Sequence, residues 1–282
     1  MKRIGFIMLS HPQARNSPIM PEVVRLLTEW GTKVQVIHPE RQLLDLSRLR
    51  VEQDLYILKA RTDMALSVAG CLHAQGAAIL NPYPVSVILR DKIITARVLQ
   101  QAGVPTPKSY MASHPRQLSR LLEEGPLVVK PYRGSGGEGV RIVWDADELD
   151  SLPIDHEPFF AQRYHRPDGL DRKIYAIKGQ VFGVMRPWPA KSYEEKLGEP
   201  FPITPELREI ALRCGEAFGI DLYGIDIIVS AGAPLVVDVS SFPGFKGVPD
   251  AALRLADFIN WAADRVLAGE SLTGPKRKKV ST

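Results

Sequence analysis

Short apolar runs alternate with amphipathic segments over the first eighty residues of the chain. The apolar runs occupy residues 4–9, 34–38, 54–58 and 77–80. Between them, segments 21–31 and 64–75 repeat apolar side chains every three to four positions. Short apolar runs are typical of buried strands, whereas the wider spacing is typical of helices. Strands separated by helices predict a parallel sheet that is covered on both faces.

The pattern changes after the turn-forming sequence Asn81-Pro-Tyr-Pro84. One helix is expected from about Arg90 to Gly103, and helical spacing returns at 204–218 and 249–267. Strand patterns dominate the rest, at two runs within 126–143 and at 159–164, 173–177, 180–186 and two runs within 223–240. Strands that follow each other through short turns predict antiparallel pairs. The chain therefore combines an α/β first part with an α+β second part.

Two aspartates stand inside apolar, β-branched runs on either side of a small-residue turn. Asp226 and Asp238 are each six residues from Gly232, so a hairpin centred there places them opposite one another, with Ser240 on the face of Asp238. Like charges facing each other across two strands are destabilising unless they are compensated. A Mg²⁺ ion, which prefers oxygen ligands, is one compensation. The alternative is that one aspartate caps a turn while the other pairs with a lysine or arginine.

A glycine-rich turn follows the strand that ends at Lys130. Four glycines lie between Gly134 and Gly139. Glycine lets backbone amides approach an anion closely, and Lys130 can reach phosphate oxygens from the end of its strand. A turn of this composition is as often merely flexible, and no Gly-Lys-Ser/Thr sequence opens a helix here.

Composition excludes several classes of protein. The chain has 282 residues, of which 45% are hydrophobic and 24% charged, as in ordinary globular proteins. The net charge of +4 equals the charge of the tail segment Lys276–Lys279, so no specific nucleic-acid partner is expected. No run reaches the length of a membrane span and no signal peptide is indicated. Cys71 and Cys214 form no metal or disulfide pattern, which favours the cytoplasm.

Four features in a fixed order resemble the ATP-grasp superfamily. They are a helix that starts with Asp91-Lys92, the strand that ends in Lys130 before the glycine-rich loop, the strand Phe160–Tyr164, and the paired-aspartate hairpin. The resemblance is nearest to the RimK-like and glutathione synthetase-type ligases and extends from about Arg3 to Leu267. Its most specific part is the run from Asp238 to Gly247. Inositol phosphate kinases of the same superfamily share some of the features.

The resemblance implies a division of the chain into five parts. Residues 1–84 are expected to form a Rossmann-like parallel-sheet domain, and residues 85–122 a linking helix and connection. Residues 123–164 would form the lid subdomain of the ATP-grasp fold, and residues 165–270 its catalytic subdomain. Residues 271–282 would be a basic, disordered tail.

The same resemblance assigns nucleotide and metal contacts by position. The residues implied to contact ATP are Lys92 and Lys130 at the phosphates, Ser135, Gly136 and Gly137 in the loop that closes over them, and Gln162, Arg163 and Tyr164 at the adenine. Asp226 and Asp238 match Mg²⁺ ligands, with Mn²⁺ as the alternative ion. Ser240 falls where the family usually has asparagine, which leaves a second metal position open.

Charged residues on two further strands are candidates for the reaction itself. Arg186 is the first choice for contacting the transferred phosphoryl group, because a guanidinium suits tetrahedral oxyanions. Lys173 is a second catalytic candidate, whereas Arg172 and Lys246 are candidates for contacting an anionic substrate. The alternative for the strand residues is that they lie on a solvated strand edge.

Three functions remain after this comparison. The Rossmann-like first domain favours an ADP-forming carboxylate–amine ligase that acts through an acyl phosphate on a small-molecule or peptide substrate. The short segment between Arg186 and Thr204, the sequence Met185-Arg-Pro-Trp188 and the aspartate at position 238 resemble the small-molecule kinases instead. A non-catalytic nucleotide-binding module is the third reading. Homo-oligomers are common in proteins of this kind, so one is possible here, and the sequence leaves the oligomeric state open.

Overall fold

The first part of the chain folds into a parallel sheet with the strand order β2-β1-β3-β4. The computed structural model describes residues 1–10, 18–134, 137–154, 157–187 and 192–272. The strands are β1 (Arg3–Ile7), β2 (Lys33–Ile37), β3 (Leu55–Leu58) and β4 (Ile79–Leu80). Helices α1 (Ile19–Glu29) and α2 (Asp63–Ala74) connect them, and a short 3₁₀ helix, η2 (Pro39–Arg41), follows β2. The predicted parallel α/β unit is confirmed.

The segment from the Pro-Tyr-Pro sequence onward forms two helices, where a turn followed by one helix from about Arg90 to Gly103 was predicted. They are α3 (Tyr83–Arg90) and α4 (Lys92–Gln101). Asp91 separates them because its backbone is extended and its carboxylate accepts hydrogen bonds from the amides of Ile93 and Ile94, at 2.9 and 3.1 Å. A side chain that caps the second helix in this way starts it anew. Lys92 is thereby the first residue of α4.

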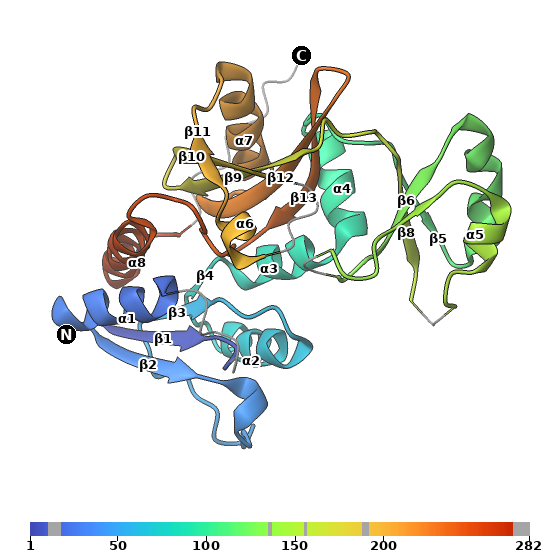
Figure 1. Cartoon of the computed structure of the whole chain (residues 1–282). Helices are drawn as coiled ribbons and strands as arrows, with labels where there is room; N and C mark the ends of the chain where they lie inside the picture. Colours follow the sequence, from blue (N-terminus) through green and yellow to red (C-terminus); the bar gives the residue numbers. More distant parts are fainter. Residues whose placement is uncertain (11–17, 135–136, 155–156, 188–191, 273–282) are drawn as a thin grey trace, which may run out of the picture.

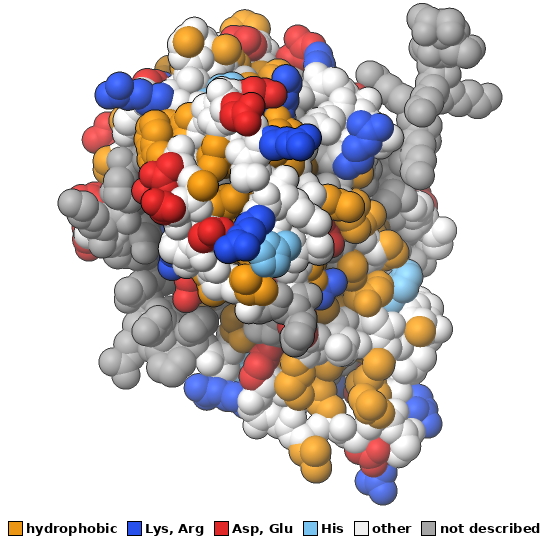
Figure 2. Space-filling model, turned by 90° about the vertical axis from the view of Figure 1, so that its right-hand side faces the viewer, with side chains coloured by type: hydrophobic (Ala, Val, Ile, Leu, Met, Phe, Trp, Pro, Cys, Tyr) orange, Lys and Arg blue, Asp and Glu red, His pale blue; other side chains and the backbone are white. Residues whose placement is uncertain are grey.

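A four-stranded antiparallel sheet forms the core of a lobe on the right of Figure 1. Its order is β5-β8-β6-β7, from β5 (Ser109–Ala112), β8 (Phe159–Arg163), β6 (Leu127–Pro131) and β7 (Arg141–Val143). The 3₁₀ helix η3 (Pro115–Glu124) and helix α5 (Ala146–Asp150) complete the lobe. Strand β5 lies in the range predicted as a connection, so the sheet includes more of the chain than residues 123–164. Acidic and basic side chains are interspersed over the face of the molecule on this side (Figure 2).

The remaining strands form a five-stranded antiparallel sheet with the order β11-β10-β9-β12-β13. They are β9 (Leu170–Ile177), β10 (Gln180–Pro187), β11 (Glu199–Phe201), β12 (Leu222–Ser230) and β13 (Ala233–Ser240). Helices α4 and α7 (Pro205–Phe218) pack on one face through buried side chains such as Leu99, Ile210 and Cys214. The helix predicted over 204–218 is confirmed, with Thr204 as its N-terminal cap and Gly219 ending it in the left-handed conformation. Helix α6 (Tyr193–Leu197) lies between β10 and β11 in the chain.

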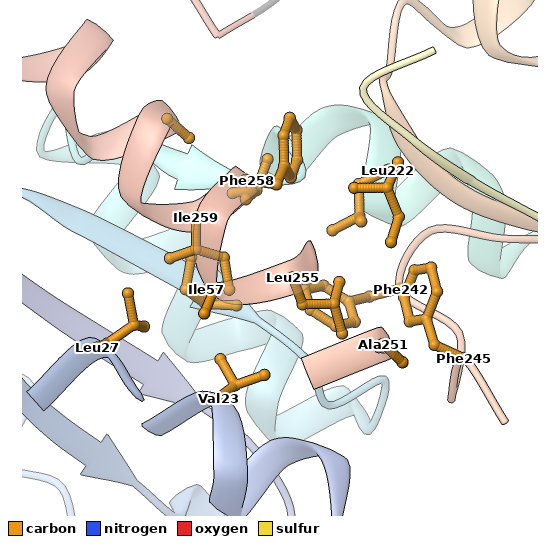
Figure 3. Close-up of a cluster of buried hydrophobic side chains, with 14 of the residues drawn as sticks. Val23, Leu27, Ile57, Leu222, Phe242, Phe245, Ala251, Leu255, Phe258 and Ile259 are labelled. Atoms are coloured by element: carbon orange, nitrogen blue, oxygen red, sulfur yellow. The ribbon is translucent and has the colours of Figure 1, made fainter. Parts of the chain in front are cut away.

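One hydrophobic core joins the parallel sheet to the five-stranded sheet. Helix α8 (Ala251–Leu267) lies beside α1 and contributes Leu255, Phe258 and Ile259 to it (Figure 3). These side chains meet Val23 and Leu27 of α1 on one side and aromatic side chains that follow β13 on the other. None of the described helices has both the length and the apolar character that crossing a bilayer requires.

Candidate active site

The β12–β13 hairpin places Asp226 directly opposite Asp238, as the sequence predicted. Its two-residue turn has left-handed backbone at both Ala231 (φ 48°) and Gly232 (φ 81°), the geometry of the tight hairpin turns that match strand twist. This turn alone would set Asp226 against Val237. A β-bulge next to Asp226 shifts the register by one residue and brings the two carboxylates together.

Strand β9 adds charged side chains to the same face of the sheet. The Lys173 ammonium donates to Asp226 Oδ1 at 2.5 Å. Asp171 lies two positions before Lys173 on β9. Its Oδ2 accepts hydrogen bonds from the Arg186 guanidinium of β10, from Nε at 2.7 Å and from Nη2 at 2.5 Å. The candidate catalytic residues Arg186 and Lys173 are therefore both anchored on carboxylates beside the aspartate pair.

The acid–base properties of this group follow from burial and from the close packing of opposite charges. Burial and the neighbouring Asp226 carboxylate raise the pKa of Asp171, although Arg186 opposes the rise. Burial is the largest influence on Lys173 and works against its charged form, but the attractions of Asp226 and Tyr175 together outweigh it and raise the pKa of Lys173. Asp171 is missing from the sequence-based assignment, although its spacing of two from Lys173 puts both residues on one strand face.

Lys130 lies between the lobe and the β12–β13 hairpin. Its ammonium donates to Gln162 Oε1 at 2.7 Å and to the carbonyl of Val237 at 3.3 Å. Desolvation lowers the pKa of Lys130 to about 8; Asp238 acts against this and Lys92 adds to it. The Gln162 amide in turn donates to Ser109 Oγ at 3.1 Å, so its side chain holds the lysine in place.

Lys92 reaches the same place from the first turn of α4. Its ammonium donates to the carbonyl of Gly134 at 2.8 Å and lies 3.6 Å from Asp238 Oδ1. Ser135 and Gly136 of the glycine-rich loop fall outside the described residues. Gly137 has φ +79°, which favours glycine there. The two predicted phosphate lysines thus converge beside Asp238.

The segment predicted to meet adenine is held by its own backbone contacts. The amide of Arg163 donates to the carbonyl of Lys108 at 2.8 Å, and that of Tyr164 to the carbonyl of Pro126 at 3.0 Å. An adenine contact through these two residues would therefore use their carbonyl groups. The Arg163 guanidinium points into the lobe, where it donates to carbonyls of Leu121 and Gly125. Its side chain is structural.

Arg172 lies on the other face of the sheet, away from the other candidate residues of β9 and β10. Side chains alternate along β9, so Arg172 shares the face of Ile174, which packs under α7, and not that of Lys173. Its guanidinium pairs with Asp168 through two hydrogen bonds of 3.0 and 2.6 Å. Lys246 lies in the segment after β13, close enough to Lys59 to affect the pKa of that lysine.

The donor set fits a Mg²⁺ ion held by two carboxylates. Asp226 and Asp238 face each other across the hairpin, and the described residues hold no group of three or more His, Cys, Asp or Glu side chains that could bind a metal. Mg²⁺ is commonly held by one or two carboxylates, with water and substrate phosphates completing its shell. Ser240 fits less well, because its Oγ accepts a hydrogen bond of 3.4 Å from the Arg61 guanidinium. Unlike the Asp226 and Asp238 carboxylates, which also lie beside lysines, this hydroxyl has no negative charge with which to attract a metal ion, so we keep the two aspartates alone.

Comparison with known proteins places this geometry in a family. Residues 89–259 match the model of the RimK-like ATP-grasp domain. A probable alpha-L-glutamate ligase 2 of Shewanella amazonensis is 27% identical over 194 residues, which are 64% of this chain and 64% of that protein. The match thus spans less than two thirds of that relative's length. A probable alpha-L-glutamate ligase 1 of the same organism is 26% identical over an alignment 278 residues long, which covers 86% of this chain and 91% of that protein.

Solved structures show the same fold over nearly the whole chain. The D-alanine–D-alanine ligase of Bacillus anthracis superposes with a TM-score of 0.71 and 23% identity, over 96% of this chain and all of that one. The family match covers β9 and β10, both predicted phosphate lysines and the aspartate hairpin. The chain is a member of the RimK-like ATP-grasp family.

Proposed function

We propose that the protein is an ATP-dependent ligase that joins a carboxylate to an amine. The observation that carries this proposal is the convergence of Lys92, Lys130, Asp226 and Asp238 beside the ion pair of Arg186 and Asp171. Lysines and metal-binding carboxylates serve phosphoryl transfer from ATP. An arginine held next to them suits the charge of an acyl phosphate.

The reaction has two steps. A carboxylate oxygen of the first substrate attacks the γ-phosphorus, and the bond to the β–γ bridging oxygen breaks to release ADP. The amine of the second substrate then attacks the acyl carbon, phosphate leaves with the electron pair of its C–O bond, and the nitrogen loses a proton. ATP with Mg²⁺ supplies the activated phosphoryl group.

The residues of the chain act by binding and by neutralising charge. Lys92 and Lys130 bind phosphate oxygens, and Asp226 and Asp238 hold the Mg²⁺. Arg186 stabilises the negative charge that develops on the transferred group, while Asp171 holds its guanidinium in place through Oδ2. Preorganised donors of this kind supply much of the rate enhancement in such reactions. Lys173 holds the Asp226 carboxylate in position through its hydrogen bond to Oδ1.

The relatives support ligation over phosphorylation of a hydroxyl. Both Shewanella relatives are named glutamate ligases, and the Bacillus anthracis structure is a ligase of two amino acids. The acceptor is accordingly a small molecule or a peptide. Mn²⁺ is a workable substitute for Mg²⁺ at two carboxylates. Free Cys71 and Cys214 suit a reducing cytoplasm.

The test is untargeted mass spectrometry of a metabolite extract incubated with the protein, ATP and Mg²⁺. The Asp226→Ala variant is the control for background chemistry. A new species equal to two metabolites minus water, together with ADP, is the expected result and identifies both substrates. A metabolite that only gains a phosphoryl group would replace the ligase with a kinase. Absence of any ATP-dependent product would leave a nucleotide-binding module.

A further inference from the structure

Three cations gather at the end of β3, beyond the residues assigned to ATP and Mg²⁺. Lys59 and Arg61 follow β3 of the parallel sheet directly, and Lys246 lies in the segment after β13. Burial, together with the positive charges of Arg61 and Lys246, lowers the pKa of Lys59 to about 7.

Lys59 has a structural role in this cluster. Its ammonium donates to the carbonyls of Phe242 at 2.9 Å and Pro243 at 3.0 Å, and it lies 5.0 Å from the centre of the Phe242 ring. These bonds fasten the end of β3 to the segment that follows the catalytic hairpin. Arg61 is thereby held against the end of β13.

Most N–H donors of the Arg61 guanidinium have no partner among the described residues. Its one described hydrogen bond is the long one of 3.4 Å to Ser240 Oγ, and within the described residues its guanidinium forms no ion pair. Ser240 is two residues beyond Asp238 on β13, and two strand residues span about 7 Å. A group bound at Arg61 therefore lies about one small substrate away from the metal and phosphate position.

The place of the cluster in the fold is one where ligands bind. In the order β2-β1-β3-β4 the chain leaves β1 toward one edge of the sheet and returns to β3 on the other side. Open α/β sheets bind ligands at the carboxyl ends of the strands where the order reverses. Lys59 and Arg61 follow the carboxyl end of β3, at this reversal.

We propose that Arg61, assisted by Lys246, binds a carboxylate of the substrate that does not react. This inference rests on the proposed ligase function and narrows its substrate to a compound with a second acidic group, such as an acidic amino acid. A guanidinium fork matches a carboxylate with two parallel hydrogen bonds, and a substrate carboxylate would neutralise the cluster. The reacting carboxylate would then point toward Arg186 and the γ-phosphate.

The experiment measures binding by calorimetry, so that it does not depend on turnover. The protein is loaded with Mg²⁺ and a non-hydrolysable ATP analogue, and L-glutamate and L-aspartate are compared with L-glutamine and L-asparagine. The wild type is expected to bind at least one acid about ten- to hundredfold more tightly than its amide, since hydrogen bonds to charged groups have this strength. Arg61→Gln should abolish that preference and leave affinity for the nucleotide unchanged.

Matched variants separate this role from a general loss of charge. Arg48→Gln removes an exposed arginine of the same domain and should keep the preference, whereas Lys246→Gln should weaken it without abolishing it. Equal binding of acids and amides by the wild type, or an intact preference in Arg61→Gln, would overturn the inference. Tighter binding of O-phospho-L-serine than of either acid would overturn it in favour of a phosphate site. All these outcomes are distinct from failure of the ligase proposal, which the product analysis decides.

Discussion

Burial controls the chemistry of Lys130 more than any single neighbour does. Desolvation is the largest influence on this ammonium, which leaves it easily deprotonated even though two aspartates lie nearby. Gln162 and the Val237 carbonyl offer only neutral oxygens. Among the described residues, no anionic group accepts a hydrogen bond from Lys130. A bound phosphate would be its first anionic hydrogen-bond partner.

The affinity for ATP should therefore depend on pH. A lysine with a pKa of about 8 loses its charge as the pH rises through 8, so the wild type should bind Mg²⁺-ATP more weakly at pH 9.5 than at pH 7. Lys130→Met should bind about ten- to hundredfold more weakly at pH 7 and lose most of the pH dependence. Calorimetric titration at several pH values measures both effects. Lys178→Met, at an exposed lysine, is the control. Identical titration curves for Lys130→Met and the wild type would refute the assignment of Lys130 as a phosphate contact.

Asp238 should matter for the metal and not for the fold. Asp238→Asn keeps the shape of the side chain but removes a negative charge that faces Asp226. We expect the Mg²⁺ concentration for half-maximal activity to rise and turnover to fall about a hundredfold, while the unfolding temperature stays the same or increases, because like charges no longer face each other. Asp257→Asn on the exposed face of α8 is the matched control. Full activity of Asp238→Asn at ordinary Mg²⁺ would refute the metal assignment.

The alternation of side chains along β9 and β10 determines which charges reach the site. Asp171 and Lys173 face it, whereas Arg172 lies on the other face of the sheet and pairs with Asp168. Arg186 lies opposite Asp171 in the ladder and so shares the face of the site. Two arginines of the same sheet thus have different expected roles.

Arg186→Gln and Arg172→Gln form a matched pair that tests this alternation. Arg186→Gln should lower kcat by about a hundredfold or more, the usual loss when a donor to a developing oxyanion is removed. Arg172→Gln should leave kcat within about threefold of the wild type, since it loses only the ion pair with Asp168 on the opposite face of the sheet. Steady-state kinetics on the substrates identified by mass spectrometry measures both values. Equal losses in the two variants would contradict the assignment.

Local patterns predicted the elements well, and long-range packing explains what they missed. Period-two alternation and turn residues are properties of neighbouring residues, so the hairpin and its opposed aspartates were predictable. The two-residue turn and the β-bulge were not, and the predicted pairing holds because the bulge offsets the turn. The pairing of Ser109 in β5 with Gln162 in β8 joins residues 53 positions apart, and the contact of Arg61 with Ser240 joins residues 179 positions apart. No local signal marks either contact.

At the scale of the whole molecule, the parallel sheet and the five-stranded sheet share one hydrophobic core, while the lobe has a core of its own. The shared core runs from α1 through α8 to Phe242 and Phe245 (Figure 3). Polar contacts cross the same boundary, because the buried Asn81 amide donates to the carbonyl of Leu222 at 2.6 Å and Lys59 bonds Phe242 and Pro243. The parallel sheet therefore holds the segment after β13 in place, and with it the proposed carboxylate site.

The lysine at this boundary gives the molecule a predictable pH dependence of stability. The folded pKa of Lys59 is about 7, below its ordinary value of about 10.4, so between these values the unfolded chain binds more protons than the folded one. Stability contributed by this group therefore rises with pH from about 7 upward, by at most about 1.4 kcal/mol per pH unit. Lys59→Met should lose this rise.

Urea unfolding between pH 6.5 and 9.5 measures the effect as a difference between the two proteins. The wild-type midpoint should climb relative to that of Lys59→Met as the pH increases, whereas Lys178→Met should follow the wild type. Parallel curves would mean that Lys59 is charged in the folded state at every pH tested, and that its carbonyl contacts outweigh burial and the repulsion of Arg61 and Lys246. Because an anion bound at Arg61 would also favour the charged form of Lys59, saturating L-glutamate should flatten the wild-type rise and leave that of Arg61→Gln unchanged.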